Sequence, residues 1–148
     1  MPINAITPNE ALSDLTRFDT IIDARSPSEH ALDRLPQAEN WPSLDDAQRV
    51  HIGTLYKQTN AFEAKKQGAA LVARNIASHI DAHLAETPRT WRPLLYCWRG
   101  GNRSGALATV LSAIGFHVHL LTGGYKAFRA EVMAQTPALA ARLSLRVV

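Results

Sequence analysis

Residues 92–115 read RPLLYCWRGGNRSGALATVLSAIG, and this stretch predicts the fold class. An apolar run ends at Cys97, the only cysteine of the chain, and a glycine pair follows it. The next residues are rich in alanine and leucine up to Gly115. The pattern predicts a buried strand over 92–97, a turn, and a helix from Arg103 to Ile114 with Gly115 as its C-terminal cap.

The segments on either side repeat this alternation of strands and helices. Apolar runs predict further strands at DTIIDAR (19–25) and HVHLL (117–121). Helical periodicity or a capping pattern predicts helices near 43–51, over 61–86 and after the glycines at 123–124. Residues 26–42 contain three prolines and are expected to be mostly turn and loop. The alternation predicts a single α/β domain with a mostly parallel sheet, whose ligands sit beyond the carboxyl ends of the strands.

Composition agrees with one domain and narrows its setting. The chain has 148 residues, 46% of them hydrophobic, and a single cysteine that excludes an internal disulfide framework and favours a reducing, cytoplasmic setting. The N-terminal residues lack a signal-peptide pattern, and no apolar run approaches the roughly 20 residues that span a bilayer, so no membrane association is expected. The net charge of +3 permits an anionic partner without requiring nucleic acid.

The segment after Cys97 has the composition of an anion-binding loop. Gly100 and Gly101 allow backbone N–H groups to point inward, the following helix adds its N-terminal amides, and Arg99 and Arg103 add full charges. We therefore expect Cys97 to be a nucleophile that ionises more readily than a free thiol, beneath an anionic substrate. The candidate substrate-binding residues follow it directly: Trp98, Arg99, Gly100, Gly101, Asn102, Arg103 and Ser104.

The loop alone leaves two activities open. Its C-x5-R-S spacing, from Cys97 to Ser104, fits a cysteine phosphatase or an arsenate-reductase-like hydrolase, and it also fits a rhodanese-type loop whose cysteine carries sulfur or selenium. A phosphatase needs an acid on a separate loop to protonate the leaving oxygen. Asp45 and Asp46 are conceivable acids, but no pattern distinguishes them.

A resemblance outside the loop favours transfer. The segment DARSPSEHALDRLPQAENWP (23–42) resembles the D-x-R-x-x-x-E…P-x-A-x-N-x-P pattern of rhodanese-like domains, with Gln37 where that pattern usually has glycine. The loop form C-x-R-G-G-x-R-S is similar to a narrower family, the N-terminal domain of tRNA 2-selenouridine synthase. GTLYKQ (53–58) and GGYKAFR (123–129) resemble two further elements of that family.

This resemblance implies a rhodanese-like domain with a central parallel sheet of about five strands flanked by helices. It implies an enzyme that replaces sulfur by selenium in wobble 2-thiouridine of tRNA, with selenophosphate as donor, Cys97 handling the chalcogen, and a geranylated thiouridine intermediate. No cofactor is expected in the domain itself. Five residues are expected to support the site: Asp23, Arg25, Tyr56, Lys57 and Lys126.

The resemblance also implies a domain border. Residues 1–135 are expected to form the rhodanese-like domain, and 136–148 a linker and the start of an absent phosphate-loop domain. The isolated domain is therefore expected not to modify tRNA. His79 and His83 have the spacing of metal ligands on a helix, but no third ligand is evident, and no metal site is expected.

Overall fold

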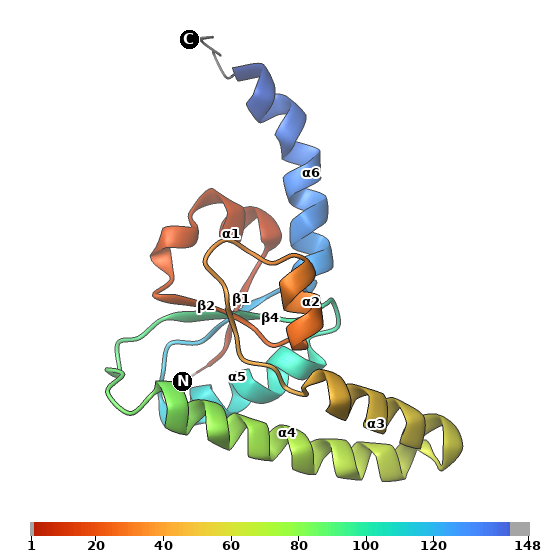
Figure 1. Cartoon of the computed structure of the whole chain (residues 1–148). Helices are drawn as coiled ribbons and strands as arrows, with labels where there is room; N and C mark the ends of the chain where they lie inside the picture. The colour runs from red at the N-terminus through yellow and green to blue at the C-terminus, as the bar shows by residue number, and fades with distance from the viewer. Residues whose placement is uncertain (1, 143–148) are drawn as a thin grey trace.

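A five-stranded parallel sheet forms the centre of the computed structural model, which describes residues 2–142 (Figure 1). The sheet order is β1-β5-β4-β2-β3, so β4 is the central strand. The strands are β1 (Asn4–Ile6), β2 (Thr20–Asp23), β3 (Glu39–Asn40), β4 (Pro93–Tyr96) and β5 (His119–Leu121). The predicted number and direction of strands are thus confirmed. Parallel pairing also aligns the strand ends, so that Asp23 of β2 lies opposite Tyr96 of β4.

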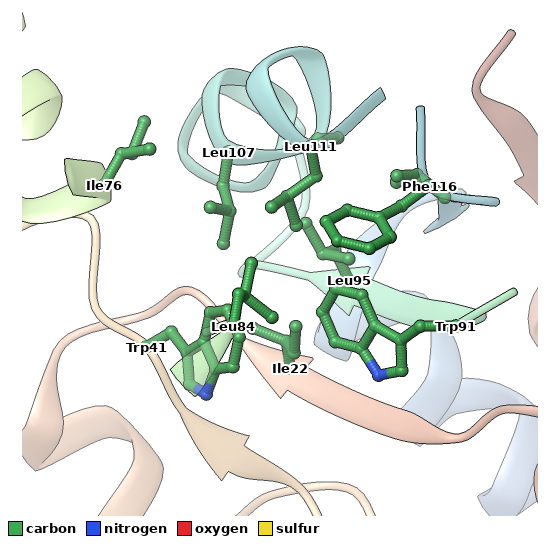
Figure 2. Packing of buried hydrophobic residues seen from close by; sticks show 11 residues of the cluster. Ile22, Trp41, Ile76, Leu84, Trp91, Leu95, Leu107, Leu111 and Phe116 are labelled. Atoms are coloured by element: carbon green, nitrogen blue, oxygen red, sulfur yellow. The ribbon is translucent and has the colours of Figure 1, made fainter. Parts of the chain in front are cut away.

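Helices cover both faces of the sheet because each strand alternates its apolar side chains between them. Ile22 and Leu95 point into a core with α4 and α5, whereas Ile21 and Leu94 point into a core on the α1 and α6 side (Figure 2 shows the first core). The helical elements are α1 (Pro8–Ser13), a 3-10 turn η1 (Leu15–Arg17), α2 (Pro27–Leu32), α3 (Asp46–Gln58), α4 (Ala61–His83), α5 (Asn102–Ile114) and α6 (Gly124–Arg142).

Helices α3 and α4 form a long antiparallel hairpin along one side of the domain (Figure 1). None of the residues in α3 is buried, and only Gln48, Ile52 and Leu55 are partly covered. The prediction of a short helix at 43–51 was therefore wrong in its extent. Contacts with α4 stabilise α3 beyond residue 51, and these contacts are not visible in the weak apolar pattern of its sequence.

The proline-rich segment also contains more regular structure than predicted. Helix α2 begins at Pro27, a favoured first helical position, and Ser26 and Glu29 form a capping box there. Two residues, Glu39 and Asn40, then pair with β2 as the edge strand β3. At the C-terminal end, α6 continues to Arg142, so residues 136–142 are helical, while 143–148 lie outside the described residues.

Candidate functional site

Cys97 follows β4 directly, at the carboxyl end of the central strand, as predicted. The chain then turns through residues 98–101 and enters α5, with Gly101 at the N-cap in the left-handed conformation (φ 77°). Glycine adopts this conformation without the steric cost that a Cβ would bring. The turn therefore places the sulfur beside the N-terminus of α5.

The sulfur of Cys97 has one side-chain hydrogen-bond partner among the described residues. The residue is 3% exposed, and the hydroxyl of Ser104 donates to its Sγ at 3.2 Å. Ser104 lies in the first turn of α5 and is itself buried. This contact holds the sulfur at the N-terminus of α5.

The loop encloses a pocket of about 240 Å³ that is lined by residues 97–103. Within the described part of the chain, the backbone N–H groups of residues 98–101 donate no hydrogen bond to a protein acceptor. These amides lie next to the N-terminus of α5, where the helix dipole favours negative charge. The pocket thus has the donors and the field that an oxyanion needs.

The N-terminus of α6 holds the loop from the other side. The N–H of Tyr125 donates to the carbonyl of Cys97 at 2.8 Å, and the N–H of Lys126 donates to the carbonyl of Trp98 at 3.0 Å. Gly124 has φ 62°, and a Cβ there would lie 2.5 Å from the Cys97 oxygen. Lys126 supports the site through its backbone. The sequence analysis did not predict the role of Gly124, although the GG pair at 123–124 was a visible signal.

Arg103 lines the pocket, and its guanidinium also forms a partly buried ion pair with Glu29. Its Nη1 donates to Glu29 Oε1 at 2.8 Å, and Arg49 donates to the same carboxylate oxygen. Glu29 thus bridges α2, α3 and α5. Partial burial raises the pKa of Glu29, but the hydrogen bond and charge of Arg103, with Ser26 and Arg49, lower it to about 2.

The Glu29→Gln variant should lose stability at neutral pH and lose much of its acid sensitivity. Because folding lowers the pKa of Glu29, its carboxylate stabilises the fold above the ordinary value of 4.5, and this contribution disappears as the pH falls toward about 2. Urea unfolding at several pH values should show the wild-type advantage shrinking across that window. Glu86→Gln is the matched control, since Glu86 is exposed and forms no ion pair within residues 2–142. Equal pH profiles for wild type and Glu29→Gln would contradict this assignment.

Asp23, the last residue of β2, pairs with Arg25, as the sequence suggested. Arg25 donates to both carboxylate oxygens of Asp23, at 3.0 and 2.8 Å, and to the carbonyl of Asp33 at 2.6 Å. Both side chains are buried. The Arg25 guanidinium lies 4.3 Å from the ring centre of Tyr125, the residue that also holds Cys97.

The structure does not bring Tyr56 and Lys57 to the cysteine. Both are exposed near the end of α3, and neither lines the pocket of the loop. The sequence analysis expected them to support the site, whereas they belong to the hairpin of α3 and α4. Trp98 and Arg99, by contrast, do line the pocket, with Trp98 38% exposed.

His79 and His83 lie against Trp41. Their rings stack on its indole at 5.9 and 4.5 Å, and His79 Nε2 is 2.8 Å from the carbonyl oxygen of Pro42. Burial lowers the pKa of His79, partly offset by that carbonyl. Across residues 2–142, no cluster of histidine, cysteine and carboxylate side chains could hold a metal ion. The same residues contain no helix with the length and hydropathy of a membrane span.

The fold and the loop together define a class: a parallel α/β domain with a cysteine at the end of its central strand. Comparison with protein families identifies that class. The rhodanese-like domain family matches residues 7–131, and the chain belongs to this family.

Two curated relatives are tRNA 2-selenouridine synthases. The protein from Shewanella piezotolerans is 35% identical over 130 residues, and that from Sulfurovum sp. is 38% identical over 128 residues. These matches cover 87% and 78% of this chain but only 36% and 32% of the relatives, so the chain spans about a third of their length.

A solved structure is similar over nearly its whole length. It is the N-terminal domain of a Clostridium difficile 630 protein that is named for ATP/GTP binding. The two chains are 32% identical, with a TM-score of 0.72, and the match covers 88% of this chain and 99% of the other. The fold built on this five-stranded parallel sheet is thus similar to that of a solved domain of comparable length.

Proposed function

We propose that this chain is the chalcogen-transfer domain of a tRNA 2-selenouridine synthase, with Cys97 carrying or activating the chalcogen. The observation that carries the proposal is the pocket over Cys97, whose unpaired amides and α5 N-terminus suit a phosphate-like donor. Selenophosphate fits this description. The names of the two curated relatives specify tRNA and 2-selenouridine.

The alternative hydrolase reading lacks its acid. Asp46 accepts hydrogen bonds from the hydroxyl and the amide of Ser28, and the hydroxyl bond in particular lowers its pKa. A general acid at neutral pH needs the opposite shift. Asp45 caps α3 by accepting from the N–H of Gln48. Both candidates therefore have structural partners, which favours transfer over phosphate-ester hydrolysis.

Mass spectrometry of the protein separates the two activities. After incubation with thiosulfate, the Cys97 thiolate should take the outer sulfur with release of sulfite, and the chain should gain the mass of one sulfur atom. The same preparation should show no turnover of p-nitrophenyl phosphate above that of a Cys97→Ala control. An unmodified Cys97 together with phosphatase turnover would support the hydrolase and reject the transferase.

We also propose that the full activity needs a second domain. The curated relatives are about three times as long as the matched segment, and the similar solved structure is itself the N-terminal domain of a protein named for ATP/GTP binding. A phosphate-loop domain would supply the nucleotide chemistry. In this account, the chain alone loads the chalcogen, while selenation of wobble 2-thiouridine, including any geranylated intermediate, requires the longer protein.

A further inference from the structure

A second cavity lies beside the cysteine pocket and shares one residue with it. It has a volume of about 370 Å³, and Trp98 lines both spaces. The remaining lining comes from α2, α6 and the segments next to them. Whatever occupies this cavity therefore lies next to the residue that follows Cys97 in the chain.

One wall of this cavity is an aromatic platform. The ring of Trp98 stacks on that of Tyr125 with centroids 5.8 Å apart and planes at 29°. Tyr125 is 6% exposed and is fixed by its hydroxyl, which donates to Asp33, and by the Arg25 guanidinium. Trp98 is nevertheless 38% exposed, so part of its ring remains accessible to a ligand although it stacks on Tyr125. Stacking on such a ring suits a flat group.

The charged groups that line the cavity are two carboxylates, Glu29 and Asp33, and two cations, Arg25 and Arg129. Glu29 is occupied by Arg103 and Arg49, and Arg25 by Asp23. Arg129, on the second turn of α6, is exposed and forms no direct ion pair within residues 2–142, although its charge adds to the Tyr125 hydroxyl in lowering the pKa of Asp33. A ligand that satisfies both the ring and this cation is flat at one end and anionic at the other.

We propose that this cavity binds one nucleotide of single-stranded RNA, with its base stacked on Trp98 and its phosphate at Arg129. Leu32, which is 89% exposed at the rim, adds apolar surface for the sugar or base edge. The inference rests on the proposed function, because it names how the tRNA substrate is held beside Cys97. A base at Trp98 lies next to the pocket in which the chalcogen is held.

Tryptophan fluorescence tests the proposal directly. Trp41 and Trp91 are 2% and 8% exposed, so quenching by a short single-stranded oligouridylate reports mainly on Trp98. Saturable quenching is expected. Anisotropy of a fluorescein-labelled oligouridylate should show Trp98→Ala binding about 5- to 150-fold more weakly, with Trp98→Phe restoring most of the affinity. Arg129→Gln should weaken binding and reduce the slope of log affinity against log salt by about 0.7.

Arg92→Gln is the matched control for charge. Arg92 is exposed immediately before β4, at the amino edge of the sheet opposite Cys97, where it pairs with Asp19 at 3.6 Å, so its loss should leave binding and salt slope unchanged. Absence of saturable binding, or equal weakening by Arg129→Gln and Arg92→Gln, would overturn the proposal. If the cavity bound a protein partner instead of RNA, no saturable binding of the oligouridylate would be seen.

The same titration on Cys97→Ser separates this inference from the proposed function. RNA binding requires neither a chalcogen donor nor chalcogen transfer, so the variant should bind the oligouridylate like the wild type. Normal RNA binding with no chalcogen on wild-type Cys97 would reject the function alone. Chalcogen loading without RNA binding would reject the nucleotide site alone.

Discussion

Replacing Cys97 with serine is expected to reduce chalcogen loading to background while the fold remains. The serine hydroxyl is a far weaker nucleophile than a thiolate and forms no persulfide or selenium equivalent, so no covalent carrier remains. The side chain is 3% exposed and lies 3.2 Å from the Ser104 hydroxyl, which can pair with a new hydroxyl. The free energy of unfolding should therefore change by about 1 kcal/mol or less. Mass spectrometry after donor incubation and urea unfolding measure the two effects.

Ser104→Ala is the graded control for this result. It keeps the sulfur but removes the hydroxyl that donates to it. Loading should become slower without disappearing, because the sulfur remains but loses the side-chain hydrogen bond that holds it in place. Full loading of Cys97→Ser, or loading lost equally in both variants, would show that the transferred atom resides elsewhere or that the loop has collapsed.

The position of the cysteine could be predicted because it depends on local pattern alone. An apolar run, a glycine pair and an alanine-rich segment specify strand, turn and helix within residues 92–115. The parallel sheet then follows from alternation of such units, and it aligns Asp23 with the end of β4. The pairing of Asp23 with Arg25 is likewise local, since the two residues are two positions apart.

The contacts that complete the site are long-range, and the sequence pattern did not reveal them. Glu29 and Arg103 are 74 positions apart, and nothing in either segment identifies the other as its partner. The extent of α3 depends on packing against α4, and the amides of Tyr125 and Lys126 reach the loop only because α6 starts beside it. The expected supporting role of Tyr56 and Lys57 stays a prediction, because a shared motif does not specify where a helix points.

Substituting Gly124 with alanine is expected to lower the free energy of unfolding more than an alanine substitution at any other glycine of the site. Its φ of 62° is in the left-handed region, where a non-glycine residue costs about 1–2 kcal/mol. The new Cβ would also lie 2.5 Å from the Cys97 oxygen and 2.7 Å from the Trp98 oxygen, and relieving such crowding costs about 1–3 kcal/mol more. Unfolding by urea should show a loss of about 2–5 kcal/mol.

Gly53→Ala is the matched control, and the contrast between the two glycines carries the argument. Gly53 lies inside α3 with helical φ and with nothing within 4 Å of a built Cβ, so alanine there should stabilise by about 0.5–1 kcal/mol. The two predicted changes thus have opposite signs. A Cβ at position 124 would crowd the carbonyl groups of Cys97 and Trp98, so the alanine variant should also slow alkylation and donor loading of Cys97. Gly53→Ala should leave both rates unchanged. If Gly124→Ala were as stable and as reactive as the wild type, α6 would not be the support that holds the cysteine loop in place.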